Sequence, residues 1–165
     1  MREQLGTTNP STGHAVPLRQ LAILGYHKIG EPPEGGWPTW YYVPEATFTE
    51  HLAYLRHTGW QVIDLATLLV GFDAPDNLPA RTVLLTFDDG YRSIRGPALE
   101  QLLRFGYPAV LFVPSNYIGH RNAFDAGIEP DEQICDWDDL RALQCCGVSV
   151  QSHGATHRHF STLPL

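Results

Sequence analysis

Short apolar runs alternate along this chain with segments whose apolar residues recur at helical spacing. The runs have the length and the content of β-branched and aromatic residues that are typical of buried strands. They cover residues 21–26, 61–63, 83–87, 107–113 and 148–150. Strands that alternate with helices are typical of βαβ units. The pattern therefore predicts an α/β fold with a parallel sheet of about five strands.

Three helices are predicted between these runs from their start and stop signals. Thr47 begins a segment with capping-box spacing, and the helix that follows should end at Gly59. A second helix carries leucines at helical intervals and is closed by Gly106. Asp136 can cap a third helix, which Gly147 terminates.

Length and composition predict one globular domain over residues 21–165, preceded by a flexible N-terminal tail over residues 1–20. The segment 31–38 holds several Pro and Gly residues, so we expect an irregular loop there. A formal net charge of −7 with no basic run argues against a nucleic-acid surface. No stretch approaches the roughly 18 apolar residues of a membrane span, and no signal peptide is recognisable, so the localisation stays unknown.

Two adjacent carboxylates follow the apolar run 83–87, where Gly90 ends it. Asp88 and Asp89 therefore lie at the C-terminal edge of a predicted strand. Because neighbouring side chains of a strand point to opposite sides, one of these carboxylates can hold a cation while the other faces a reacting group. The natural division gives the cation to Asp89, although the sequence leaves the reverse assignment open.

Two histidines follow the run 148–150. His153 and His157 have i, i+4 spacing and can face one point if the residues between them turn helically. Two imidazoles and one carboxylate are the usual donors of a catalytic zinc site, with an open position for water. A second carboxylate beside that water can take its proton. Either motif alone is common in turns and on surfaces, but both at strand ends predict a metal-dependent hydrolase.

At these residues the chain resembles the polysaccharide deacetylases, which share the NodB homology domain of carbohydrate esterase family 4. Residues 86–90 match the first family motif and residues 153–157 match the second. Residues 109–114 and 137–140 look like the strand and the helix between the two motifs. Residues 23–27 are similar to the opening strand of the branch that acts on β-1,6-linked poly-N-acetylglucosamine.

The resemblance implies hydrolysis of N-acetyl groups on a polysaccharide that contains N-acetylglucosamine. It implies Asp88 as general base and Asp89, His153 and His157 as ligands of a divalent metal. Zinc suits these ligands, and cobalt, nickel or iron would also bind. No other cofactor is implied. Family members often act at the cell envelope or outside the cell.

The resemblance also implies a parallel (β/α) barrel of about seven strands, of which this chain holds about five. The chain ends at Leu165, before the later family motifs, which supply an Arg, an oxyanion-binding loop and a general-acid His. We therefore expect an incomplete barrel, which a C-terminal segment or a second chain completes. The family commonly has Ser or Thr after the first His of the second motif, whereas this chain has Gly154.

Two alternative functions remain open at this stage. The domain can be a catalytically impaired remnant that still binds metal or saccharide. It can also be a phosphatase with an Asp nucleophile, which residues 87–90 suggest and which would not need the two histidines.

Several other residues can have either a functional or a structural role. His27 can line the same mouth as the metal, although a structural role is commoner, and His159 is expected to face solvent. Aromatic residues cluster at the end of the loop 31–38 and directly after it. They can stack on sugar rings, but such clusters more often pack a long loop against the core. They are Trp37, Trp40, Tyr41 and Tyr42.

Overall fold

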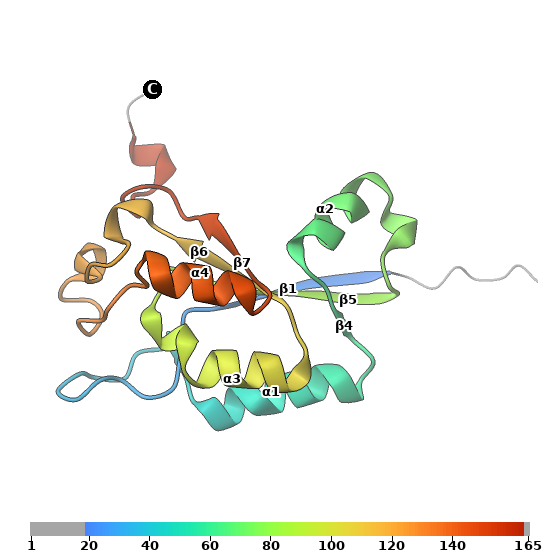
Figure 1. Ribbon diagram of the computed structural model, residues 1–165, viewed down its shortest axis with the longest axis horizontal. Coiled ribbons are helices and arrows are strands. Elements are labelled where there is room, and N and C mark those ends of the chain that lie inside the picture. The colour runs from blue at the N-terminus through green and yellow to red at the C-terminus, as the bar shows by residue number, and fades with distance from the viewer. Residues whose placement is uncertain (1–18, 164–165) are drawn as a thin grey trace, which may run out of the picture.

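A computed structural model describes residues 19–163 and contains a five-stranded parallel sheet (Figure 1). The strand order is β1-β5-β6-β7, and β4 also pairs with β5. The predicted parallel α/β fold is therefore confirmed. The sheet strands are β1 (Gln20–Tyr26), β4 (Gln61–Val62), β5 (Arg81–Phe87), β6 (Ala109–Val113) and β7 (Val148–Ser152). The helices are α1 (Glu45–His57), α2 (Leu65–Asp73), α3 (Pro97–Phe105) and α4 (Trp137–Cys145).

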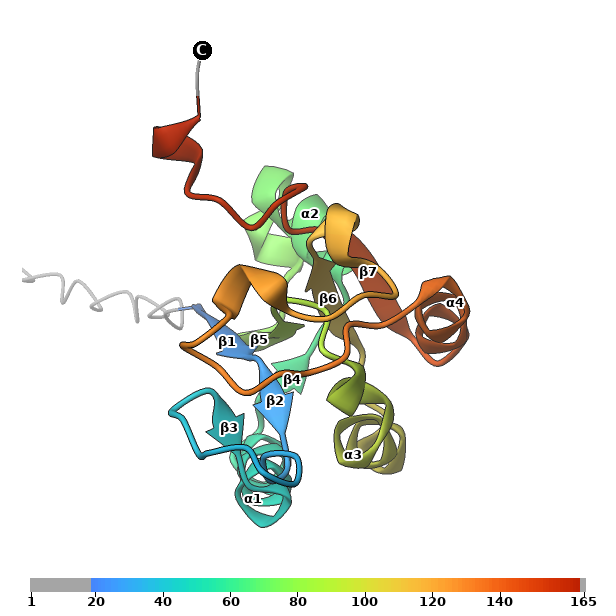
Figure 2. The ribbon, with the colours of Figure 1, turned by 90° about the vertical axis from the view of Figure 1, so that its left-hand side faces the viewer.

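Helices cover both faces of the sheet, but three of them gather on one face. Figure 2 shows α1, α3 and α4 arranged around the outside of the curved sheet. Val83, Leu85 and Phe87 of β5 belong to the large core on this face. The intervening Leu84 packs with Val110 in a smaller core that includes residues of α2. This alternation follows from the two-residue period of a strand.

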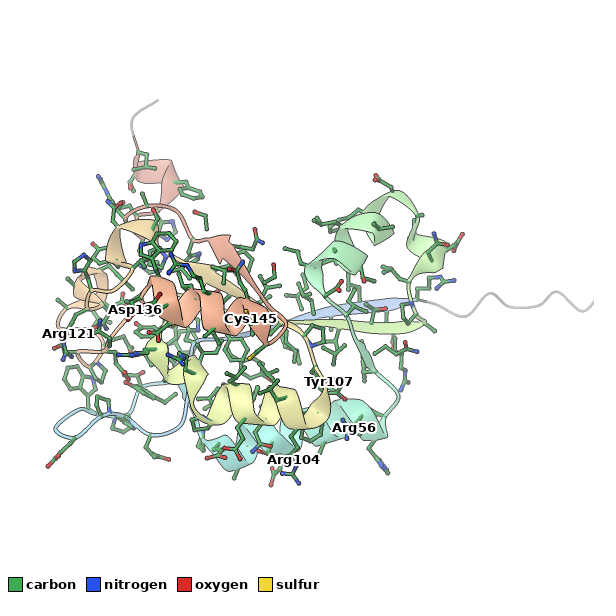
Figure 3. The ribbon with its side chains drawn as sticks, in the orientation of Figure 1. Arg56, Arg104, Tyr107, Arg121, Asp136 and Cys145 are labelled. Carbon is green, nitrogen blue, oxygen red and sulfur yellow. The ribbon has the colours of Figure 1, made fainter. Side chains whose placement is uncertain are left out.

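The boundaries of two helices follow their sequence signals. Asp136 accepts a hydrogen bond from the Asp139 N–H at 2.8 Å, and Asp139 accepts one in return from the Asp136 N–H at 3.1 Å. Figure 3 shows Asp136 at the start of α4 and Cys145 at its end. Gly106, with a left-handed φ of 67°, closes α3. Both predicted caps are confirmed.

Other elements differ from the prediction. Helix α1 begins at Glu45, because the extended Pro44 precedes it, so the capping box at Thr47 is wrong. Helix α2 was not predicted, although the Asp64 side chain accepts a hydrogen bond from a backbone N–H of its first turn, as an N-cap should. A separate parallel pair, β2 (Lys28–Ile29) and β3 (Tyr42–Val43), was also not predicted.

Within residues 19–163 the sheet stays open, with β1 and β7 as its outer strands. Leu21 and Ile23 of β1 are 45% and 57% exposed. The predicted tail over residues 1–20 lies outside the described residues except for its last two, and Gln20 already belongs to β1. No helix in the described part of the chain is long and apolar enough to cross a membrane.

Candidate active site

The C-terminal ends of the parallel strands bring the two predicted motifs to one end of the sheet. Asp88 and Asp89 directly follow β5, and His153 directly follows β7, with β6 between these two strands. The Asp88 N–H donates to the Tyr26 carbonyl at 2.8 Å, which fixes this end of β5 against β1. Figure 2 views the molecule from this end and shows the segment between β6 and α4 crossing over it.

A tight backbone turn separates the two carboxylates. Asp89 and Gly90 have left-handed φ values of 69° and 70°. Glycine is required at the second position, because a β-carbon there would lie 2.7 Å from Cγ1 of Val113. The turn leaves Asp89 only 3% exposed, whereas Asp88 is half-buried. The two neighbouring acids therefore occupy different environments.

Backbone hydrogen bonds hold residues 153–157, which we call the histidine loop, against the segment that follows β6. The His153 N–H donates to the Val113 carbonyl at 2.9 Å. The Ser115 N–H donates to the Gly154 carbonyl at 3.0 Å. The Asn116 N–H donates to the Ala155 carbonyl, also at 3.0 Å. The position of the loop thus depends on hydrogen bonds between segments that are about 40 residues apart. A local sequence pattern cannot predict such bonds.

The route by which the two histidines meet differs from the prediction. Residues 153–157 form no helical turn, and His157 instead has a left-handed φ of 55°. Gly154 also has a left-handed φ, of 75°, a conformation that Ser and Thr adopt at a cost. The Gly154 N–H donates to Ser152 Oγ at 3.2 Å.

Asp89, His153 and His157 converge. Oδ1 of Asp89 lies 3.0 Å from Nε2 of His157 and 3.3 Å from Nε2 of His153. One donor atom from each residue lies within 4.8 Å of the others. Although both nitrogens are close, Oδ1 is a buried acceptor without a hydrogen bond among the described residues. A buried carboxylate oxygen facing two imidazole nitrogens fits a divalent cation between them.

Charge and burial shift the pKa values of the surrounding groups. Burial raises the pKa of Asp88, an effect that nearby His27 and His153 partly offset. The Asp89 carboxylate raises the pKa of His153, against the opposing effect of burial. Burial lowers the pKa of His27, whose Nε2 lies 3.8 Å from Oδ2 of Asp89. His27 therefore lines the site mouth, while His159 is exposed as predicted.

The loop between β6 and α4 supplies contacts that sequence reasoning missed. The ring of Phe124 lies 4.5 Å from that of His157, measured between centroids. The adjacent Asp125 accepts a hydrogen bond from the buried Tyr91 hydroxyl at 3.0 Å. Figure 3 marks Arg121 in this loop, near the start of α4. No spacing signal in the sequence connects Phe124 with the second motif.

A buried ion pair joins the same loop to β2. Lys28, which is fully buried, places its Nζ 2.7 Å from Oε2 of Glu129, which is 4% exposed. Thr39 donates a second hydrogen bond to this carboxylate at 2.8 Å. The ammonium group also lies 4.5 Å and 4.3 Å from the ring centroids of Tyr42 and Tyr91. Because Lys28 directly follows His27 in the chain, this ion pair also holds the backbone next to His27 in place.

The fold and the site define a parallel α/β domain with an Asp-His-His cluster at its strand ends and a second carboxylate beside it. The family model described as polysaccharide deacetylase matches residues 76–164, just over half of the chain. The chain belongs to the polysaccharide deacetylase family.

Individual relatives agree with this membership. The chain is 28% identical over 147 residues to Bacillus subtilis YxkH, a protein named as a polysaccharide deacetylase, covering 87% of this chain and 46% of that protein. It is 35% identical over 94 residues to the poly-beta-1,6-N-acetyl-D-glucosamine N-deacetylase of Escherichia coli K12, covering 57% and 14%. The chain thus spans less than half the length of these curated relatives.

A solved structure supports the fold. The deacetylase PplD of Streptococcus pyogenes, solved in complex with acetate, is similar with a TM-score of 0.72 at 18% sequence identity. The similarity covers 90% of this chain and 62% of that structure. At this level of identity the comparison concerns the architecture alone, and it agrees with the parallel α/β sheet described above.

Proposed function

We propose that this domain is a metal-dependent hydrolase that removes N-acetyl groups from a polysaccharide containing N-acetylglucosamine. The observation that most supports the proposal is the buried Oδ1 of Asp89, which lacks a hydrogen bond and faces two imidazole nitrogens at 3.0 and 3.3 Å. Membership of the polysaccharide deacetylase family supports the choice of substrate class. The name of the E. coli relative supports N-acetylglucosamine as the sugar unit.

In this proposal residues 21–165 are part of a NodB-type barrel. The outer strands β1 and β7 are the places where a further segment or a second chain would complete the sheet. The exposed apolar side chains of Leu21 and Ile23 on β1 support this expectation, because apolar surface beside an open strand edge is usually covered by another element.

Asp89, His153 and His157 would hold the divalent ion, and zinc suits these donors best among zinc, cobalt, nickel and iron. When bound, such an ion supplies a Lewis acid that polarises the acetyl carbonyl and lowers the pKa of water. The Asp89 carboxylate would be the most buried of the three ligands, because Asp89 is only 3% exposed. The two imidazoles must be neutral to act as donors.

Asp88 would act as the general base. Its carboxylate accepts a proton from the water that attacks the acetyl carbon, and burial strengthens it as a base by raising its pKa. The C–N bond then breaks, releasing acetate and leaving an amine on the sugar. The nitrogen gains a proton as it leaves, and the step balances if the protonated Asp88 carboxyl returns the proton that it took from the water.

The test compares metal content with acetate release in purified variants. Alanine at Asp89, His153 or His157 should remove the ion and abolish acetate release from N-acetylglucosamine oligomers. Asp88→Asn should keep the ion and lose acetate release. His159→Ala is the matched control, because this exposed histidine lies on the same segment and should change neither quantity.

The outcomes separate the competing functions. Equal metal loss in Asp88→Asn and Asp89→Ala would show that the division of roles is wrong. A wild-type chain that binds one ion but releases no acetate would favour the saccharide-binding remnant. Phosphatase activity that survives His153→Ala would favour the Asp-nucleophile class.

A further inference from the structure

The aromatic residues that follow the Pro- and Gly-rich loop behave in two ways. Tyr42 is half-buried, its hydroxyl donates to Glu132 at 2.6 Å, and its ring lies beside the Lys28 ammonium. Trp40 does the opposite, because 79% of it is exposed, more than any other large hydrophobic residue in the described chain. Packing therefore explains Tyr42 but leaves Trp40 without a structural role.

The exposed indole stands at one end of a row of rings that leads to the metal-site residues. The centroids of the Trp40 and Tyr41 rings are 3.8 Å apart, with 32° between the ring planes. Tyr41 in turn lies 4.4 Å from the His27 ring. Nε2 of His27 is 3.8 Å from Oδ2 of Asp89. The large apolar surface of Trp40 thus adjoins the proposed active site.

The backbone around Trp40 is anchored on both sides. The Lys28 N–H donates to the Tyr41 carbonyl at 3.2 Å, and the Tyr42 N–H donates to the Thr39 carbonyl at 3.2 Å. The Thr39 hydroxyl donates to the buried Glu129 at 2.8 Å. The segment between β2 and β3 extends beyond the strand ends (Figure 1). These hydrogen bonds nevertheless hold the turn that carries Trp40 in place. A ligand would therefore immobilise little additional chain on binding.

We propose that Trp40, supported from behind by Tyr41, is a sugar-binding platform that stacks on a pyranose ring of the polysaccharide. This inference rests on the proposed function and names the residue that binds the sugar next to the one being deacetylated. His27 lies between the platform and Asp89, with its ring centroid 6.2 Å from that of Trp40. The platform therefore adjoins the site of hydrolysis without coinciding with it.

The chemistry of the ligand matches this surface. A β-linked N-acetylglucosamine ring carries its polar substituents in equatorial positions, so its two faces present C–H groups. The negative face of an aromatic ring attracts these weakly positive hydrogens, and indole offers the largest such face. The indole N–H can also donate to a sugar hydroxyl. An uncharged pyranose ring with two C–H faces is thus the kind of ligand that Trp40 fits.

The test measures the binding of a β-1,6-linked N-acetylglucosamine pentamer by calorimetry. The background is Asp88→Asn with metal bound, in which the pentamer should not be turned over. Adding Trp40→Ala should weaken binding about tenfold, the equivalent of about 1.4 kcal/mol, with Trp40→Phe intermediate. The monosaccharide, which cannot reach both places, should bind equally well to both proteins. Metal content should not change, because Trp40 is not among the metal-site residues.

Phe72→Ala is the matched control. Phe72 is an aromatic residue of comparable exposure, 67%, but it lies beside Leu21 and Thr82 near the N-terminal ends of β1 and β5, opposite the active site. This substitution should leave pentamer affinity unchanged. The pentamer should also alter the tryptophan emission of the parent protein, and Trp40→Phe should remove most of that change.

Each outcome decides a separate point. Equal pentamer affinity with and without the Trp40 indole overturns the platform and leaves the proposed hydrolysis intact. Trp40-dependent binding without acetate release from the otherwise wild-type chain supports the platform and counts against the hydrolysis. A metal-loaded protein that does not bind the pentamer at all overturns the platform, whatever its activity on smaller acetamides.

Discussion

Breaking the buried pair between Lys28 and Glu129 should destabilise the whole domain. Lys28→Met keeps most of the length of the side chain but removes its charge, so the Glu129 carboxylate stays buried with only the Thr39 hydroxyl as a partner. Glu129→Gln does the converse and leaves a fully buried ammonium group without its counter-charge. The double substitution removes both charges together.

The magnitude follows from the burial of both partners. Removing one member of a buried ion pair costs about 3–5 kcal/mol, because the remaining charge is neither solvated nor paired. Lys28 also lies over two tyrosine rings, at 4.5 and 4.3 Å from their centroids, so Lys28→Met should be the more costly single change. For a domain of this size the loss corresponds to a fall of roughly 6–20 °C in Tm. The double variant should recover most of it.

Urea unfolding of the wild type, both single variants and the double variant completes a double-mutant cycle. The expected coupling energy is at least about 2 kcal/mol, because charge is removed pairwise in the double variant. Additive effects, or single costs below about 1 kcal/mol, would refute the reasoning and would mean that water reaches the pair. A reduced m-value would instead indicate a less compact native state.

Three further predictions concern the site. Gly90→Ala should destabilise the fold by roughly 1–3 kcal/mol more than Gly127→Ala, because both glycines have left-handed φ but only the first would bring a β-carbon 2.7 Å from Val113; equal urea midpoints would contradict this. Because Asp89 raises the pKa of His153, the protonated ring should stabilise the metal-free fold below about pH 6.5, and this stabilisation should vanish as pH rises through the higher folded pKa. Metal affinity should change in the opposite sense and fall as the pH drops, because only the neutral ring binds; pH-independent affinity in metal titrations would exclude His153 as a ligand.

The sequence predicted those parts of the fold whose signals are local. The five sheet strands follow from apolar runs of strand length, and Gly106 and Asp136 mark the ends of helices through backbone conformation and hydrogen bonding that one or two residues determine. The meeting of Asp89 with the two histidines was also predictable in outline. Parallel strands bring their C-terminal ends to one edge of the sheet, whatever the loops do.

The remaining features depend on contacts between distant segments. Lys28 looks like a surface residue in sequence, and only its pairing with Glu129, 101 positions later, allows its burial. The short pair β2–β3 depends on the same contact region. The helical route from His153 to His157 was wrong, because hydrogen bonds to the segment after β6 determine that loop. Such bonds leave no periodicity along the chain.

The arrangement around Asp89 is costly for a protein that has no ligand there. A buried carboxylate oxygen without a hydrogen-bond donor destabilises the folded state, and a left-handed φ at a non-glycine residue adds strain. The surrounding structure nevertheless enforces both features, through Gly90 packed against Val113 and through the backbone bonds of the histidine loop. Features that lower stability while their supports are built into the fold are typical of functional sites. A cation bound between Asp89 and the two imidazoles would satisfy the unpaired oxygen without moving the backbone, which is why the proposed chemistry centres on this residue.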